Sequence, residues 1–361
     1  MIKVVNSSKE EFFQLIESKN VICFGAGDKF REFCEKYSVE DKIRYVVDNY
    51  KSGTQITIND CFIPAVAMDE VIIEEDDVML ITSLKFAKEL IQQLDTIQKF
   101  HNQNIYVYEL MTDTKSKKKV YLGTDREDII PKKIHYCWFG NTEIPKQFSD
   151  NIETWKKYCP DYEFIRWSED NYDITKNLYM KQAYEAKKWG FVPDYARLDI
   201  INTYGGIYLD TDVELLKSLD ELLSYEFFCG FESVNWVAFG LGFGACKGNA
   251  ILQEMMGDYE SRQFINEDGT YNLVASPVYQ TQVLERHGLI KDGHTQLIEN
   301  GIILSPEFLA PINMMGVGNP TINSFSIHQY AATWLDKEQR EEKEKLIEKC
   351  KYIINRIEKD N

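Results

Sequence analysis

Residues 204–212 are the segment that most constrains the fold of this chain. In it, two glycines are followed directly by Ile-Tyr-Leu and then by two carboxylates. The glycine pair predicts a turn, and the apolar residues predict a short buried strand that ends at Asp210. Side chains alternate along a strand, so Asp210 and Asp212 point the same way and can hold one divalent cation. Since the chain has 58 acidic residues, a solvent-exposed pair is the alternative.

A helix is predicted just before this turn, over residues 191–203. A proline suits its first position, and Asp194 suits the first turn, where the helix dipole favours an acidic side chain. Asp194 and Arg197 are three residues apart and share one face, whereas Leu198 and Ile201 lie on the face that packs inward. A capping Asp paired with a surface Arg explains the pattern without any function.

Three blocks together resemble a known family. They are Ile134-His135-Tyr136-Cys137-Trp138-Phe139-Gly140, Asp194-x-x-Arg197 and Tyr204-Gly205-Gly206-x-Tyr208-x-Asp210-x-Asp212. Their order and spacing resemble the DXD-containing glycosyltransferases of the glycosyltransferase 32 type, which include capsular polysaccharide synthesis proteins. The glucosylating domains of large clostridial toxins are more distantly similar. The resemblance covers residues 131–336 and does not include residues 1–110.

The resemblance implies an α/β fold of the GT-A type that transfers a sugar from a nucleotide-diphosphate sugar, with a UDP-sugar as the expected donor. It implies that Asp194, Arg197, Asp210 and Asp212 are the catalytic residues. The two carboxylates of the Asp-x-Asp motif would hold Mn²⁺ or Mg²⁺, and transfer would retain the anomeric configuration without a dedicated general base. The implied acceptor is a surface glycan, such as a capsular or lipopolysaccharide precursor, or its lipid-linked form.

Aromatic residues are implied to bind the donor. An apolar run over residues 133–138 predicts a central strand, which in the resembling transferases carries an aromatic residue that stacks on the nucleotide base. Trp138 matches that residue, and stacking contributes about 1–3 kcal/mol. An ordinary core tryptophan is the alternative. The resemblance also implies that Tyr208 and Trp334 contact the donor.

Residues 326–334 resemble the closing motif of the same transferases, which contains a histidine and ends in tryptophan. His328 brought beside Asp212 would complete the metal site, and its nitrogen would favour Mn²⁺ over Mg²⁺. The chain departs from the motif at Gln329, where many relatives have a second histidine, and at Thr333, where they have serine. A structural histidine is therefore the alternative.

The beginning of the chain predicts a separate small α/β domain, because strands and helices alternate as in a parallel, doubly wound sheet. Strands are predicted over residues 20–24, 43–48, 78–82 and 105–108, and helices over 29–36 and 86–100. The segment resembles Rossmann-like accessory domains fused to bacterial sugar-polymer enzymes.

Gly25-x-Gly27 follows the first predicted strand, and Asp48 lies about 20 residues further on, which is most of a dinucleotide-binding fingerprint. Phe30 occupies the third glycine position, which weakens the case for a bound pyrophosphate. A structural or assembly role and the binding of a nucleotide or nucleotide sugar both stay open. Two rival functions follow: an NAD-dependent oxidoreductase or epimerase acting through this domain, and a noncatalytic glycan-binding scaffold.

Composition excludes several partners. The net charge of -17 argues against binding to nucleic acid, whose affinity depends on cationic side chains. No signal peptide is visible, and no apolar run approaches the roughly 20 residues that span a bilayer. Eight cysteines without C-x-x-C spacing indicate reduced thiols and a cytoplasmic protein. The basic run 115–119 is either a solvated linker or a peripheral contact with the cytoplasmic membrane face.

The length of 361 residues suffices for two cores. We expect an accessory domain over residues 1–112, a linker over 113–132, a transferase domain over 133–336 and a C-terminal amphipathic helix over 337–361. The apolar stripe of that helix comprises Leu346, Cys350, Ile353, Ile354 and Ile357. We expect this stripe to pack on the transferase domain or across a homodimer.

Overall fold

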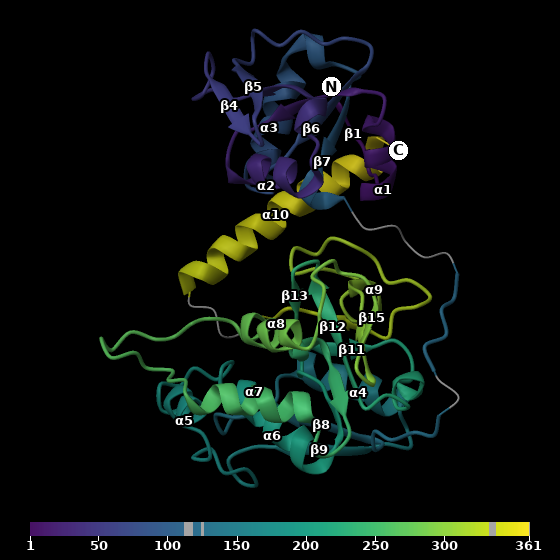
Figure 1. Cartoon of the computed structure of the whole chain (residues 1–361), viewed down its shortest axis with the longest axis vertical. Helices are drawn as coiled ribbons and strands as arrows, with labels where there is room; N and C mark the ends of the chain where they lie inside the picture. Colours follow the sequence, from purple (N-terminus) through teal and green to yellow (C-terminus); the bar gives the residue numbers. More distant parts are fainter. Residues whose placement is uncertain (112–117, 124–125, 332–336, 361) are drawn as a thin grey trace. The chain divides into compact units, whose positions relative to one another are not determined.

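The computed structural model describes residues 1–111, 118–123, 126–331 and 337–360. Two compact units account for them, and each is built on its own central sheet (Figure 1). The first unit comprises Met1–Lys115, Met315–Val317 and Glu338–Asn361. The second unit comprises Ser116–Met314 and Gly318–Lys337. The fold is therefore mixed α/β, as the sequence predicts.

A seven-stranded sheet forms the centre of the first unit, in the order β1-β7-β6-β2-β3-β5-β4. Neighbouring strands are parallel except for the hairpin of β4 and β5. The strands are β1 (Lys3–Val4), β2 (Asn20–Phe24), β3 (Ile43–Val47), β4 (Gln55–Ile58), β5 (Cys61–Val66), β6 (Asp77–Ile81) and β7 (Asn104–Val107). The four predicted strands are present. The hairpin escaped prediction because Pro64 argues against a strand, yet β5 pairs with β3 only beyond it, at Ala65 and Val66.

The helices of the first unit are α1 (Lys9–Ile16), α2 (Asp28–Tyr37), α3 (Leu84–Thr96) and α10 (Lys337–Asp360). Helix α10 packs within this unit, which corrects the expectation that it packs on the transferase domain or across a dimer. Cys350, Ile353 and Ile357 are buried in one cluster with residues of β2, β6 and α3. Arg356 also pairs with Asp95 of α3 at 2.7 Å. The C-terminal stripe thus completes a core that the first 112 residues leave open.

The second unit is built on an eight-stranded mixed sheet whose main order is β15-β16-β12-β14-β10-β8-β9, with β13 paired to β12. Strands β8, β9 and β10 are parallel, and β14 is antiparallel to β10 and β12. The strands are β8 (Lys133–Cys137), β9 (Glu163–Trp167), β10 (Gly206–Tyr208), β12 (Phe227–Ser233), β13 (Trp236–Val237), β14 (Phe243–Ala245), β15 (Gln296–Ile298) and β16 (Gly301–Leu304). A separate ribbon pairs β11 (Val213–Leu215) with β17 (Ser326–His328).

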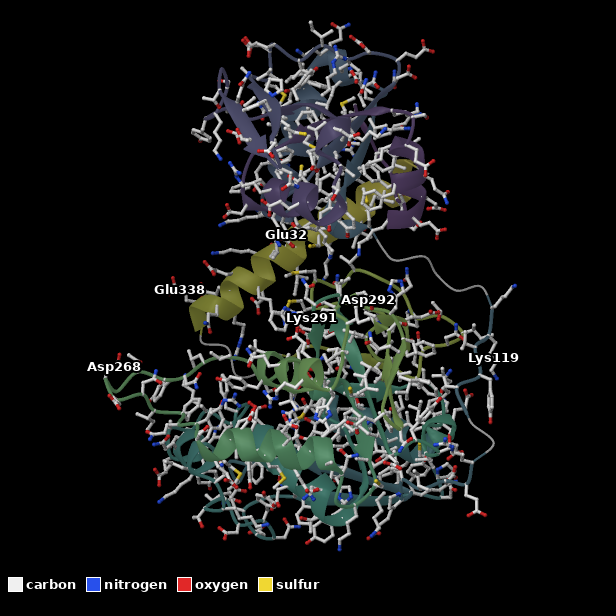
Figure 2. The ribbon with its side chains drawn as sticks, viewed as in Figure 1. Glu32, Lys119, Asp268, Lys291, Asp292 and Glu338 are labelled. Atoms are coloured by element: carbon white, nitrogen blue, oxygen red, sulfur yellow. The ribbon has the colours of Figure 1, made fainter. Side chains whose placement is uncertain are left out.

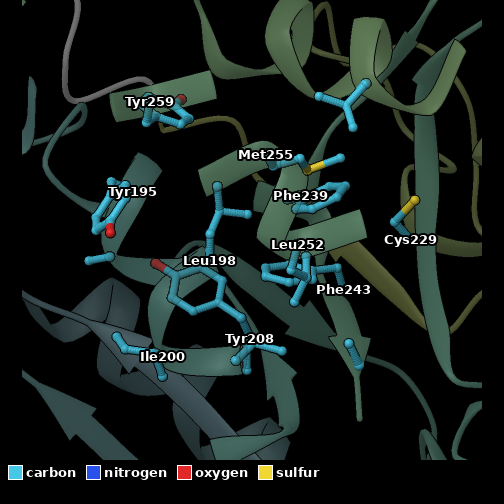
Figure 3. Packing of buried hydrophobic residues seen from close by; sticks show 14 of the residues in the cluster. Tyr195, Leu198, Ile200, Tyr208, Cys229, Phe239, Phe243, Leu252, Met255 and Tyr259 are labelled. Carbon is cyan, nitrogen blue, oxygen red and sulfur yellow. The ribbon is translucent and has the colours of Figure 1, made fainter. Parts of the chain in front are cut away.

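The helices of the second unit are α4 (Lys146–Tyr158), α5 (Leu178–Glu185), α6 (Pro193–Tyr204), α7 (Ala250–Glu260), α8 (Ser276–Arg286) and α9 (Pro306–Leu309). Charged side chains project from the surface, among them Asp268, Lys291 and Asp292 (Figure 2). Two apolar cores flank β10, because Tyr208 enters one cluster while Ile207 and Leu209 enter the other. Figure 3 shows the cluster that contains Tyr208.

Part of the expected linker 113–132 belongs to the second unit. Leu122 and Ile130 are buried in one of its cores. The N–H groups of Ile129 and Ile130 both donate to the carbonyl oxygen of Leu223, at 2.9 and 3.0 Å. Because the segment is mostly polar, its sequence predicted a linker and not the burial of Leu122 and Ile130.

The turn between α6 and β10 requires glycine. Gly205 and Gly206 have φ angles of 65° and 111°, and a Cβ on Gly206 would lie 2.8 Å from the backbone oxygen of Lys133. Buried His135 fixes this turn, since its Nε2 lies 3.0 Å from the Gly205 oxygen and its Nδ1 3.1 Å from Trp167 Nε1. An indole N–H only donates, so Nδ1 accepts and Nε2 carries the proton donated to Gly205.

Candidate functional site

Strand β10 delivers the first carboxylate of the Asp-x-Asp motif. The hydroxyl of Tyr208 donates to Asp210 Oδ1 at 3.0 Å, and the N–H of Val213 donates to the Asp210 carbonyl at 3.0 Å. We expected Tyr208 to contact the donor, but its side chain is buried in the core and its hydroxyl is engaged by the carboxylate. Tyr208 therefore positions Asp210.

The ribbon of β11 and β17 brings a distant histidine to the second carboxylate. His328 Nε2 lies 3.1 Å from Asp212 Oδ1, and the Ala331 N–H donates to Asp212 Oδ2 at 2.9 Å. Burial alone raises the pKa of Asp212, but neighbouring His328 brings it below its usual value. Burial lowers the pKa of His328, but the neighbouring carboxylates, Asp212 foremost, together raise it, so the net change is upward.

Asp210, Asp212 and His328 form a candidate metal site. One ligand atom of each lies within 4.8 Å of the other two, and no second cluster of this kind occurs among the described residues. Two carboxylate oxygens and an imidazole nitrogen suit Mn²⁺. Burial also raises the pKa of Asp210, so a bound cation would offset an unfavourable negative charge there. The residues therefore fit a divalent cation.

Asp194 and Arg197 form a buried ion pair beside this cluster. Arg197 Nη2 donates to Asp194 Oδ1 at 3.0 Å, and Arg197 Nη1 lies 3.6 Å from Asp210 Oδ2. Burial raises the pKa of Asp194 to about 6, although Arg197 opposes the shift. The alternative interpretation, a capping Asp paired with a surface Arg, is wrong. Both side chains are only 5% exposed, and α6 is buried from Asp194 to Ile201.

Trp138 lies at the same edge of the sheet as the Asp-x-Asp motif. It follows β8, the parallel neighbour of β10, and parallel strands end at a common edge where ligands commonly bind. Trp138 is half-buried and lies outside the core cluster that takes in Cys137 and Phe139. Its indole N–H donates to the Thr142 oxygen at 2.9 Å. An ordinary core tryptophan does not fit this placement.

The closing motif is described only as far as Ala331, so Trp334 lies outside the described residues. Gln329, which replaces the second histidine of many relatives, donates to Asn151 Oδ1 of α4 at 2.9 Å. Asn151 in turn donates to the Thr211 oxygen at 2.9 Å. Sequence reasoning missed Asn151, whose signal is a polar residue on the apolar face of α4. It ties the loop between the two carboxylates to Gln329, the residue that follows β17.

Glu232 on β12 was also missed. Burial raises the pKa of this half-buried carboxyl, while His328 lowers it in part. Glu232 in turn adds to the upward shift of the pKa of His328. A third carboxylate therefore adds negative charge around the histidine. Its position at the end of an apolar strand gave no signal that distinguished it from other acidic residues.

In the first unit, the carboxylate of Asp48, which follows β3, bonds the backbone of the glycine turn after β2. Asp48 accepts N–H groups of Ala26 at 2.9 Å, Tyr50 at 2.9 Å and Lys51 at 3.1 Å. The Lys51 ammonium donates to the Ala26 oxygen at 2.7 Å, and Phe30 is fully buried. The acidic residue of the partial fingerprint is thus used by the backbone, which favours a structural role over the binding of a ribose.

The family match to known proteins lies within the second unit. Residues 145–228 match the family described as the glycosyltransferase sugar-binding region containing a DXD motif. The chain is 28% identical over 159 residues to inositol phosphoceramide mannosyltransferase 3 of Schizosaccharomyces pombe, covering 42% of this chain and 44% of that protein. It is 26% identical over 140 residues to the initiation-specific alpha-1,6-mannosyltransferase of Saccharomyces cerevisiae, covering 33% and 29%.

Among solved structures, the PaToxG glycosyltransferase is similar with a TM-score of 0.36 and 20% identity, over 44% of this chain and 68% of that one. The chain spans less than half the length of these two curated relatives. The sequence matches show that part of the chain is similar to the sugar-binding region of DXD-containing glycosyltransferases. Within the described ranges, no helix has the length and apolar character needed to cross a bilayer.

Proposed function

We propose that this chain is a metal-dependent glycosyltransferase that moves a sugar from a nucleotide-diphosphate sugar to a glycan acceptor. One observation carries the proposal: Asp210, Asp212 and His328 converge within 4.8 Å beside the buried Asp194–Arg197 pair. The family match spans both carboxylates and the ion pair, which gives independent support.

In this proposal, Asp210, Asp212 and His328 would hold Mn²⁺ or Mg²⁺, which would supply positive charge against the departing diphosphate. Arg197 adds a fixed positive charge at the same place and, with Asp194, orients the donor sugar or its phosphate. Burial keeps the Asp194–Arg197 pair out of bulk water, where its electrostatic effect would be weaker.

Trp138 stacks on the nucleotide base in this proposal, because its half-buried indole lies at the sheet edge where the Asp-x-Asp motif begins. A donor contact by Trp334, which lies outside the described residues, rests on the family resemblance alone. Tyr208 acts through Asp210, whose carboxylate its hydroxyl holds.

The transfer breaks the bond between the sugar C1 and the diphosphate oxygen, and the electron pair stays on the diphosphate. The acceptor hydroxyl oxygen bonds to C1 on the face that the diphosphate leaves, which retains the anomeric configuration. The hydroxyl proton passes to the departing diphosphate. Asp194 is an unsuitable base because it is buried and bonded to Arg197.

The proposed donor is a UDP-hexose, and the proposed acceptor is a capsular or lipopolysaccharide precursor or its lipid-linked form. The names of the relatives add mannose as a candidate sugar and an inositol phosphoceramide lipid as a model for a lipid-linked acceptor. GDP-mannose therefore belongs beside the UDP-sugars in any screen of donors.

We also propose a GT-A arrangement of the glycosyltransferase 32 type for the second unit and a Rossmann-like accessory role for the first. Strands β8, β9 and β10 run parallel into the candidate site, and the first unit has an almost wholly parallel sheet. Eight free thiols suit a reducing compartment such as the cytoplasm, with peripheral membrane contact during transfer to a lipid-linked acceptor.

A thermal-shift screen tests the proposal. UDP-glucose, UDP-galactose, UDP-N-acetylglucosamine and GDP-mannose are added to the full chain with and without Mn²⁺. A ligand that binds only the native state raises its stability, so at least one donor should raise the Tm more with Mn²⁺ than without it. Asp212→Asn should remove that increment. A screen in which no nucleotide sugar shifts the Tm would contradict the proposal.

A further inference from the structure

Gly240 lies directly against the Asp210 carboxylate. A Cβ at this position would approach Asp210 Oδ2 more closely than real Cβ atoms approach their neighbours, and it would lie 3.5 Å from Arg197 Nη1. The φ angle of Gly240 is not in the left-handed region, so an alanine could adopt this backbone conformation. What the position demands is space beside the carboxylate.

The turn that carries Gly240 is anchored on both sides. Phe239 is fully buried and stacks on Phe243, with ring centroids 4.4 Å apart, in the core drawn in Figure 3. Leu241 is buried in the other core of the second unit. Because neighbouring residues are held in two cores, the turn cannot easily retreat from a side chain added at position 240.

Helix α8 holds the same turn through two buried polar side chains. Gln280 Oε1 accepts the N–H of Phe239 at 3.0 Å, and Thr281 Oγ1 accepts the N–H of Val237 at 2.9 Å. Both side chains are almost completely buried, so these bonds are made without competition from water. A side chain added at Gly240 must therefore displace the Asp210 carboxylate, the terminal group of a rotatable side chain, before it displaces the backbone.

We infer that Gly240 is a positioning residue for Asp210, and that its lack of a side chain lets the carboxylate reach both Arg197 and the candidate metal site. The consequence for cation binding rests on the proposed function. Gly242 and Gly244, the next two glycines in the alternating series, are required for other reasons. Gly242 has a φ angle of 123°, and a Cβ on Gly244 would strike the ring of Phe228. Each of the three alternate glycines therefore meets a different structural requirement.

The first test is the affinity of the full chain for Mn²⁺ alone, measured by calorimetry. Gly240→Ala should weaken binding at least about tenfold, which corresponds to about 1.4 kcal/mol, while the chain still unfolds cooperatively. Gly244→Ala is the matched control, because it introduces a comparable clash against Phe228 away from the carboxylates. It should lower the Tm and leave the Mn²⁺ affinity of the folded chain unchanged. Wild-type affinity in Gly240→Ala would overturn the inference.

A double-mutant cycle tests the same contact without a metal. The change in unfolding stability caused by Gly240→Ala is measured in the wild-type chain and in Asp210→Ala. If the added Cβ acts on the carboxylate, Gly240→Ala should destabilise the wild-type chain more than it does Asp210→Ala. Equal changes in both backgrounds would overturn the inference. A wild-type chain that binds no Mn²⁺ would instead contradict the proposed metal site, and the cycle would still decide the role of Gly240.

Discussion

The Arg197 guanidinium joins Asp210 to the helix that precedes the glycine turn. Its Nη1 lies 3.6 Å from Asp210 Oδ2, while its Nη2 bonds Asp194 Oδ1 at 3.0 Å. One buried cation thus serves two carboxylates from different elements. The position of the first carboxylate in the Asp-x-Asp motif therefore depends on α6 as well as on β10.

Arg197→Ala should lower the free energy of unfolding by about 3–5 kcal/mol, because it leaves the buried Asp194 carboxylate without its partner. Arg197→Lys should keep the fold but weaken donor binding, since a single ammonium cannot reproduce the two-sided geometry of the guanidinium. Urea unfolding and donor titration of both variants check this. A lysine variant with wild-type donor affinity would contradict the proposed role of the guanidinium.

Trp138→Ala should reduce donor affinity by about 1–3 kcal/mol through the loss of base stacking, with a smaller effect on the turnover of bound donor. Donor affinity by calorimetry and kcat under saturation separate the two effects. Tyr121→Ala is the control, because Tyr121 is another aromatic residue of the second unit and is 71% exposed. Equal donor affinities in the two variants would remove Trp138 from the donor site.

His135 should make the second unit less stable in acid. Burial lowers its folded-state pKa to about 4, below the ordinary value of 6.5. Its contribution to stability is therefore complete above pH 6.5 and is lost as the pH falls towards 4, at about 1.4 kcal/mol per pH unit. His135→Gln should lose less stability between pH 7 and 4.5 than the wild-type chain does. Identical losses in urea unfolding would show that His135 is not the group responsible.

Ile353→Ala should destabilise the first unit by about 2–5 kcal/mol, because its side chain is fully buried in the core that α10 completes. Ile354→Ala, at a half-buried position on the same helix, should cost less. Calorimetric unfolding combined with donor titration checks both effects. Donor binding by the second unit should be the same in the two variants, and a selective loss in Ile353→Ala would link the first unit to the donor site.

The sequence located the elements whose signals are local. The glycine pair, the apolar strand after it and the proline at the start of α6 fixed the neighbourhood of Asp210, because each acts through the backbone of its own segment. The parallel sheet of the first unit followed from the alternation of strands and helices. These features needed no knowledge of distant contacts.

Residues that act at long range were harder to predict. Periodicity showed that α10 has an apolar stripe, but not which core would take Cys350 and Ile353, because partner choice depends on three-dimensional complementarity. Tyr208 was assigned to the donor because it belongs to the matching motif, whereas its ring is buried among residues from distant parts of the chain and its hydroxyl bonds Asp210. Asn151 gave only the signal of a polar residue on an apolar helix face, and Glu232 gave none, since their neighbours come from distant parts of the chain.

Release of free nucleoside diphosphate from nucleotide sugars tests the central claim most directly. The full chain is assayed with each UDP-hexose and with GDP-mannose, in the presence of Mn²⁺ and after removal of the metal by a chelator. We expect Mn²⁺-dependent release from at least one donor, near-complete loss in Asp212→Asn, and wild-type release in Asp150→Asn, whose exposed carboxylate lies on α4. Release that survives both metal removal and Asp212→Asn would contradict the account.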